Sequence, residues 1–220
     1  MKINENLVLT EIEPNDIVDG KCVIPFGVKE IGREVFINEQ NLTHVTLPSS
    51  IQKINTAAFA YCKNLTSITI PHGVTYIGNQ AFENCKTLES IRLSDTLQYI
   101  GDRAFAYTAI NNITLPDHLE YIGDTAFWDT KLKDVDIPAS VQRIKEAAFG
   151  GDTLRKVNIH GNAKYEVNSF FNPNPRCDVK VVHISTKTGS VYDDIVNGKI
   201  NEKTLHTTDE KNNIELDMER

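Results

Sequence analysis

Apolar residues recur along this chain with a period of 22 or 23 residues. Phenylalanine occupies one column of the period, with intervals of 23, 23, 23, 22 and 22 residues: Phe36, Phe59, Phe82, Phe105, Phe127 and Phe149. Isoleucine lies five residues before each phenylalanine: Ile31, Ile54, Ile77, Ile100, Ile122 and Ile144. A third apolar column lies upstream, and proline follows it in five of six copies: Ile24, Leu47, Ile70, Leu93, Leu115 and Ile137. Three columns in one register define a tandem repeat.

Each copy begins with a segment that predicts a short β-strand. In the copy "LTSITIPHGVTYIGNQAFENCKT" at 65–87, apolar and polar residues alternate before Pro71, and this period of two is typical of a half-buried strand. Pro71 ends the strand because proline has no N–H to donate. One copy is too short to bury its own apolar residues, whereas stacked copies share a core, with parallel strands about 4.8 Å apart. The pattern therefore predicts a solenoid of about six to seven rungs.

Glycine follows the repeat isoleucine in four copies, at Gly32, Gly78, Gly101 and Gly123. Asn55 and Lys145 take its place in two others. Glycine and asparagine adopt positive φ at little cost, whereas lysine there is strained. We therefore expect a turn with positive φ at this position, and a different turn at Lys145.

The copies resemble the BspA-type (Treponema-type) leucine-rich repeats of bacterial and protist proteins over about residues 23–160. The resemblance rests on the L-x-x-L-x-L strand followed by P-x-x-V-x-x-I-G-x-x-A-F-x-x-C. It implies a leucine-rich repeat solenoid, an α/β horseshoe rich in β-structure. A parallel sheet would line its concave face, with short strand or 3₁₀ structure opposite. It also implies a surface adhesin, a host-binding protein or an exported effector.

The two ends depart from the repeat and divide the chain into four parts. Residues 1–22 are predicted to be an N-terminal cap over the first rung, and residues 23–160 the leucine-rich repeat solenoid. Residues 161–200 are assigned to a C-terminal cap that covers the last rung. Residues 201–220 are polar and mostly acidic, and we expect a flexible tail.

Two elements are predicted within the C-terminal cap. The segment "VKVVHI" at 179–184 has the composition of a strand. The segment "GSVYDDIVNGKI" at 189–200 is interpreted as a short helix, with Ser190 as its N-cap and Gly198 as its C-terminal stop.

Charge and hydropathy exclude two classes of partner. The formal net charge is −7 and the pI is about 5.4, so the chain lacks the basic excess of a protein that binds phosphate backbones, and no nucleic-acid partner is expected. No run of 18 apolar residues predicts membrane insertion, and the first residues contain no apolar run of a signal peptide. By sequence the protein is expected in the cytoplasm, whereas the resemblance points to the cell surface or to export.

The residues with reactive side chains form no recognisable catalytic or metal-binding motif. The four cysteines include no C-x-x-C pair, and the histidines fall at different phases of the repeat. No nucleophile elbow, phosphate-binding glycine loop or H-E-x-x-H motif is present. We therefore expect neither an enzyme nor a cofactor. Cys62 and Cys85 share a column with small polar residues, and they are predicted to be free buried thiols in a turn that closes each coil.

The first candidate binding surface is a column of tyrosines. The position before the repeat isoleucine runs Glu30, Lys53, Tyr76, Tyr99, Tyr121 and Arg143, so three successive rungs place tyrosine beside tyrosine with a cation at each end. Trp128 follows Phe127 in the same region. Tyrosine, tryptophan and arginine are enriched at interface hot spots, which makes this column a candidate protein-binding surface. The alternative is a scaffold role, because aligned aromatics also stabilise neighbouring strands.

The second candidate surface is the outward side of the predicted concave strands. Its residues grade from small hydroxyl side chains to charged ones toward the C-terminal end: His44, Thr46, Ser67, Thr69, Ser90, Arg92, Asn112, Thr114, Asp134, Asp136, Lys156 and Asn158. This face has no aromatic anchor, and such faces are often merely solvated.

The sequence favours a non-catalytic module that presents a repeat-built surface to a protein partner. One alternative is a structural protein that self-associates into homo-oligomers. Another is an exported effector whose activity lies in the C-terminal 60 residues.

Overall fold

A continuous stack of aromatic rings forms the centre of the protein, whose structure is a computed structural model describing residues 1–166, 168–171, 179–184, 191–196 and 206–207. The six repeat phenylalanines are each at most 2% exposed. Successive rings lie 4.8–5.3 Å apart between centroids, with planes within 17° of parallel. Phe170 extends the stack at 6.0 Å from Phe149. The repeat isoleucines are also fully buried, so the predicted solenoid of about six to seven rungs is confirmed, with about seven turns.

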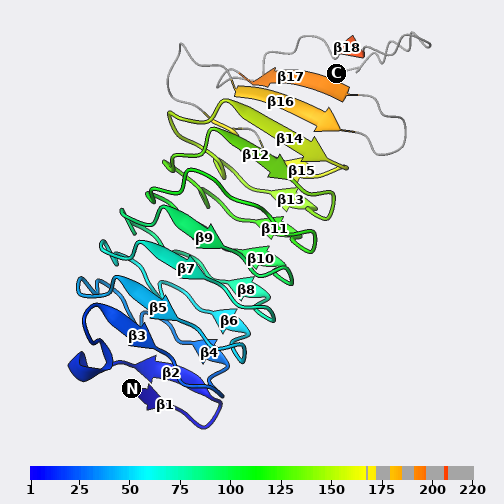
Figure 1. Ribbon diagram of the computed structural model, residues 1–220. Helices are drawn as coiled ribbons and strands as arrows, with labels where there is room; N and C mark the ends of the chain where they lie inside the picture. The colour runs from blue at the N-terminus through cyan, green and yellow to red at the C-terminus, as the bar shows by residue number, and fades with distance from the viewer. Residues whose placement is uncertain (167, 172–178, 185–190, 197–205, 208–220) are drawn as a thin grey trace.

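One side of the solenoid is a nine-stranded sheet that runs the length of the stack (Figure 1). All its strand pairs are parallel except that of β1 and β2. The repeat isoleucines pair directly with one another across it, as Ile100 does with Ile77 and Ile122. In spatial order its strands are β1 (Lys2–Ile3), β2 (Val8–Glu11), β4 (Glu30–Ile31), β6 (Lys53–Ile54), β8 (Tyr76–Ile77), β10 (Tyr99–Ile100), β11 (Tyr121–Ile122), β13 (Arg143–Ile144) and β15 (Lys164–Tyr165).

The other row of strands, which we call the front face, is divided into two sheets. The first contains β3 (Lys21–Val23), β5 (His44–Thr46), β7 (Ser67–Thr69) and β9 (Ser90–Arg92). The second contains β12 (Asp134–Ile137), β14 (Lys156–His160), β16 (Val179–Ile184), β17 (Val191–Val196) and β18 (His206–Thr207).

The segment between these two sheets forms no strand, so the predicted strand placement of Asn112 and Thr114 is wrong. No backbone hydrogen bond joins the described residues 111–115 to residues 90–93 or to residues 134–137. The gap coincides with a change in the repeat, because Ile91 lies nine residues after Phe82 and Ile113 only eight after Phe105. Pairing resumes between β12 and β14, two copies of the shorter kind. We call this break in the front face the seam.

The glycine column does not have positive φ, and the turn strain predicted at Lys145 is likewise wrong. A Cβ added to Gly101 would lie 2.6 Å from the backbone nitrogen of Asn79, so at this rung glycine allows the close approach of the preceding rung. Positive φ occurs instead two residues before and two residues after each repeat phenylalanine, as at Arg103 (56°) and Tyr107 (60°).

Replacing Gly101 with alanine should lower the free energy of unfolding by about 1–3 kcal/mol, because the new methyl group overlaps backbone of the preceding rung. Lys145→Ala is the matched control, since that position of the column already carries a Cβ. Its partly exposed ion pair with Glu166 contributes little to stability, because water screens the two charges. Urea denaturation measures both values. Equal losses would contradict a steric role for the glycine.

The helix predicted at 189–200 is wrong, because Val191–Val196 form strand β17. This strand pairs antiparallel with β16 and so covers its outer edge, which would otherwise leave backbone groups unpaired. The strand predicted at 179–184 is β16. Ser190, Gly198, Cys177 and most of the predicted tail lie outside the described residues.

Helical structure in the described part of the chain is limited to a three-residue 3₁₀ turn, η1 (Pro14–Asp16). Within those residues no helix has the length and apolar character needed to cross a membrane.

Candidate functional site

The three tyrosines of the nine-stranded sheet form a face-to-face stack on its outer side. Tyr76 and Tyr99 have ring centroids 4.8 Å apart, and Tyr99 and Tyr121 have centroids 4.7 Å apart with planes 1° from parallel. They alternate along their strands with the buried isoleucines, and each tyrosine is half-buried. We call this row the tyrosine stripe. Because the rings cover one another's faces, a partner would meet ring edges and hydroxyl groups.

The cations at the two ends of the stripe are in register with it. Lys53 pairs with Tyr76 across the sheet, and Arg143 pairs with Tyr121. The Lys53 Nζ lies 3.7 Å from the Glu30 carboxylate. In the described part of the chain, the one cation–π contact joins Arg103 to Tyr107, neither of which belongs to the stripe. Lys53 and Arg143 are exposed and extend the stripe as charged ends.

Burial changes the acidity of the stripe. Burial, together with the neighbouring Tyr121 and Tyr76, raises the pKa of Tyr99 to about 12. Burial also raises the pKa of Tyr121, with a further contribution from Asp102. These two hydroxyl groups are therefore neutral at physiological pH and can both donate and accept hydrogen bonds.

A ladder of side chains that sequence reasoning missed runs beside the stripe. Each member accepts a hydrogen bond from the backbone N–H of the next rung: the Asn79 Oδ1 from Asp102 at 3.0 Å, the Asp102 Oδ1 from Asp124 at 2.9 Å, and the Asp124 Oδ1 from Glu146 at 3.1 Å. The available signal in the sequence was the column directly after the glycine, where Asn79, Asp102 and Asp124 have short side chains that end in an oxygen. The ladder fixes the spacing of the rungs that carry the tyrosines.

The front face presents most of its predicted residues to solvent. Ser67 and Asn158 are half-buried, whereas the other candidates on its strands are exposed: His44, Thr46, Thr69, Ser90, Arg92, Asp134, Asp136 and Lys156. The Asn158 Nδ2 donates to the Asp136 Oδ1 at 2.7 Å, so two members of this face satisfy each other.

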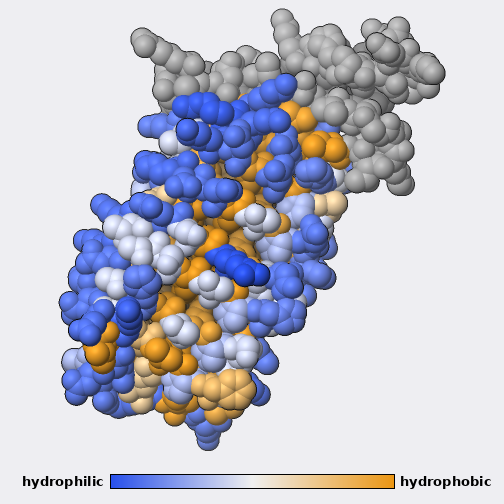
Figure 2. Space-filling model, in the orientation of Figure 1, coloured by the Kyte–Doolittle hydropathy of each residue, from blue (hydrophilic) through white to orange (hydrophobic). Residues whose placement is uncertain are grey.

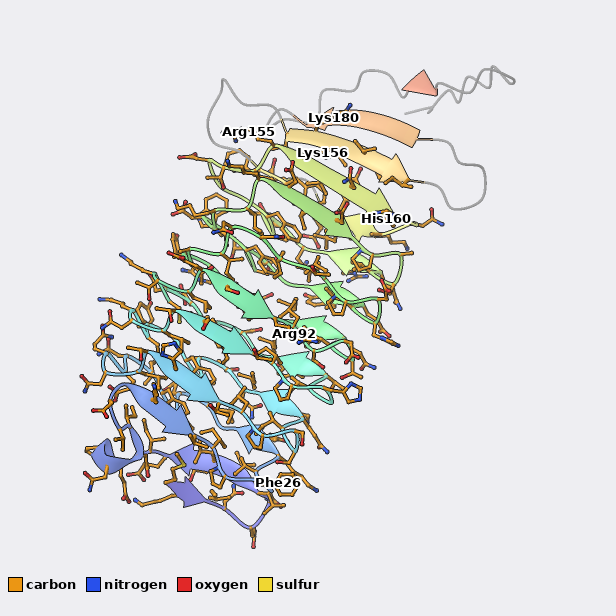
Figure 3. The ribbon with its side chains drawn as sticks, viewed as in Figure 1. Phe26, Arg92, Arg155, Lys156, His160 and Lys180 are labelled. Atoms are coloured by element: carbon orange, nitrogen blue, oxygen red, sulfur yellow. The ribbon has the colours of Figure 1, made fainter. Side chains whose placement is uncertain are left out.

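Apolar side chains also reach the surface of the front face. Figure 2 shows them gathered in a band along the axis of the solenoid, and Figure 3 places Arg92 in the middle of the same view. At the seam, the β9 segment and the adjoining segment without a strand line a groove of about 800 Å³, to which Arg92, Asn112 and His118 contribute. This face therefore has more apolar surface than the polar pattern of its strands predicted.

Trp128 lies with a different set of residues from the tyrosine stripe. It stacks with Phe171 at 6.1 Å between centroids and lines a pocket of about 430 Å³ together with Tyr107 and Arg103. Sequence reasoning missed Tyr107 and Arg103. For Tyr107 the available signal was the column two residues after the repeat phenylalanine, where Tyr61 and Tyr107 both occur.

A buried carboxylate lies next to this pocket. Glu83 is 1% exposed and accepts from the Arg103 guanidinium, with the Arg103 Nε 2.9 Å from the Glu83 Oε1. The Gln80 Nε2 donates to the other carboxylate oxygen at 2.7 Å. Hydrogen bonding to Glu83 in turn raises the pKa of Arg103. Glu83 is therefore a structural anchor for Arg103.

The cysteines close the coils of their rungs, as predicted. The Cys62 Sγ donates to the Phe36 carbonyl at 3.0 Å, and the Cys85 Sγ to the Phe59 carbonyl at 3.1 Å. Burial raises the pKa of Cys85 well above its usual range, and raises that of Cys22 to about 11. These protonated thiols are poor nucleophiles. No group of three or more His, Cys, Asp or Glu side chains in the described ranges is placed to hold a metal ion.

These features define the class of the protein, a parallel β-solenoid of leucine-rich repeats without a recognisable catalytic constellation among its described residues. The model of the BspA-type leucine-rich repeat region matches six copies over residues 29–156. The chain therefore belongs to the BspA-type leucine-rich repeat family.

Solved structures of bacterial leucine-rich repeat proteins share the fold. The T. pallidum leucine-rich repeat protein is 29% identical with a TM-score of 0.58, over 70% of this chain and 78% of that one. A leucine-rich cell surface protein from Faecalibacterium prausnitzii is 24% identical with a TM-score of 0.52, over 80% of this chain and 59% of that one. The chain thus spans less than two thirds of the F. prausnitzii protein. A search of curated proteins found no match.

Proposed function

We propose that the chain is a non-catalytic interaction module. Through its outer surface it binds a protein partner, which is a host or cell-surface target. The observation that carries the proposal is the tyrosine stripe. Tyr76, Tyr99 and Tyr121 stand where the other rungs have charged residues, so the rung itself does not require tyrosine. Half-buried aromatic side chains in fixed positions give a large contact area at little entropic cost.

Family membership supports this proposal at a general level. Repeat proteins of this kind present outward residues that vary from rung to rung without disturbing the core. The similarity to a protein described as a cell surface protein supports a surface or exported location for this chain.

The test is comparative affinity capture with the intact chain as bait. The variant Tyr76→Ser, Tyr99→Ser, Tyr121→Ser should lose at least about ten-fold in retention of the partner, as expected for removal of interface hot spots. The variant Thr69→Glu, Ser90→Glu on the front face is the control and should retain it. Circular dichroism must show both variants folded. Equal retention by both variants would assign the stripe to the scaffold and contradict the proposal.

Self-association is the second candidate, because the first rung exposes apolar residues where other rungs are polar. Val23 is 66% exposed and Phe26 82% exposed, in columns that elsewhere contain mainly Thr, Ser, Asp or His. Light scattering over a dilution series tests this candidate, and a monomer at every concentration would exclude it. The third candidate, an effector activity in the C-terminal 60 residues, falls largely outside the described residues.

A further inference from the structure

The pocket lined by Tyr107 and Trp128 has a floor of small residues and two aromatic walls. Ala106, Thr125 and Ala147 line it together with the two aromatic side chains, and its volume is about 430 Å³. The sequence column of Trp128 otherwise contains mostly smaller side chains: Ile37, Ala60, Glu83, Ala106 and Gly150. The rung therefore does not require an indole at this place.

The indole of Trp128 is held in a fixed position. A Cβ on Gly150 would lie 2.2 Å from the Trp128 ring, so the ring lies directly against the Gly150 backbone. Phe171 stacks with the indole, with planes 9° from parallel. The aromatic wall is thus preorganised before any ligand arrives, which reduces the entropy lost on binding.

The floor of the pocket has the backbone conformation of the other rungs. Thr125 has a φ of 50°, and its counterparts two residues before the other repeat phenylalanines also have positive φ, so the pocket is built on the regular turn of the repeat.

The charge of the pocket is negative. The guanidinium of Arg103 is neutralised by the buried Glu83, and the nearby Lys145 is paired with Glu166. Within the described residues, Asp124 and Glu146 form no ion pair, although Asp124 accepts the backbone N–H of Glu146 through one oxygen. Aromatic walls beside two carboxylates that form no ion pair suit a cation, and a planar guanidinium can both stack on a ring and bind a carboxylate. Arg103 already lies over the Tyr107 ring, 5.9 Å from its centroid, so a second guanidinium would stack on Trp128.

We infer that this pocket binds an arginine side chain of a partner protein. The inference deepens the proposed function, because the pocket adjoins the end of the tyrosine stripe: Asp124 lies three residues after Tyr121 and near enough to raise the pKa of its hydroxyl. One partner surface can therefore lie along the stripe and place an arginine against Trp128.

The single tryptophan of the chain makes the pocket directly observable, because all indole fluorescence comes from Trp128. The probe is the peptide acetyl-Gly-Arg-Gly-amide, titrated into the full chain at fixed ionic strength. The control probe contains citrulline, the neutral isostere of arginine. We expect a saturable change in Trp128 emission for the arginine peptide with a dissociation constant on the order of 1–10 mM, and binding at least threefold weaker for the citrulline peptide.

Two isosteric substitutions test the role of charge. Asp124→Asn keeps an oxygen to accept the Glu146 N–H, and Glu146→Gln keeps the size of an exposed side chain; together they should weaken binding of the arginine peptide at least threefold. If thermal denaturation shows that this variant is not folded, Tyr107→Leu, which removes one aromatic wall of the pocket, takes its place and should also weaken binding of the arginine peptide. Equal responses to both peptides, or full binding by a folded variant, would overturn the inference. Because the assay uses no partner protein, such a failure would leave the capture experiment on the tyrosine stripe unaffected.

Discussion

Replacing Phe105 with alanine will lower the free energy of unfolding by about 3–5 kcal/mol, the range for loss of a fully buried aromatic ring. Phe105 is fully buried and contacts Phe82 and Phe127, with ring centroids 5.3 and 5.2 Å away. The substitution leaves a cavity in the middle of the stack, where the neighbouring rungs are tied together on the nine-stranded sheet and cannot collapse into it.

Equilibrium urea denaturation followed by circular dichroism measures this loss. Ile37→Ala is the matched control, because Ile37 directly follows a repeat phenylalanine but is 45% exposed, and its loss should stay below about 1 kcal/mol. A loss below about 1.5 kcal/mol for Phe105→Ala would show that the rungs close around the cavity, and would contradict a rigid stack.

The second large effect is expected when the buried carboxylate of Glu83 loses its partner. Arg103→Met should cost about 2–4 kcal/mol, because it leaves an ionised group that is 1% exposed with Gln80 as its remaining side-chain donor. The Arg103 side chain is 45% exposed, so water already weakens its attraction to Glu83. The loss of stability therefore comes mainly from leaving the Glu83 carboxylate buried without a charged partner.

A double-mutant cycle separates these two causes. The variant Glu83→Leu, Arg103→Met removes both charges and should recover at least half of the stability that Arg103→Met loses. Urea denaturation of the single and double variants provides the measurement. If the double variant loses the sum of the two single losses, the pair is not coupled, and Arg103 stabilises the protein through its packing alone.

The periodicity of the sequence was sufficient to predict the core and the path of the chain. The columns of Phe105 and Ile100 are apolar because every rung buries the residue at that position. The six copies in one sequence can therefore be compared with one another to find the buried positions. The tyrosine stripe followed from the same columns, because strict registry places Tyr99 directly between Tyr76 and Tyr121.

The errors arose where backbone geometry, rather than residue type, decides the structure. Glycine is favoured both where φ is positive and where another backbone segment approaches closely. The sequence alone does not show which of these two reasons applies at Gly101. The segment at 191–196 is flanked in the sequence by residues typical of helix caps, Ser190 and Gly198, but it pairs with β16 and forms a strand. The seam at 111–115 coincides with the loss of one residue between the repeat phenylalanine and the following front-face segment. The effect of this shortening on hydrogen bonding depends on the lengths of the neighbouring rungs.

The pocket beside Trp128 was missed for a related reason. Its residues come from three rungs and from four positions of the repeat: Tyr107 lies two residues after one repeat phenylalanine, whereas Asp124 and Glu146 both follow the glycine position. Reading the repeat column by column finds stripes that run along the axis and overlooks sites that lie diagonally across it.

The seam gives the molecule different mechanical properties on its two sides. The nine-stranded sheet is hydrogen-bonded without interruption from β1 to β15, whereas the front face is tied across residues 111–115 by side-chain packing alone. Under a force that pulls the two ends apart, we expect the hydrogen-bonded side to resist extension and the front face to open first at the seam. The solenoid should therefore bend in one preferred direction, at a place set by a single missing residue.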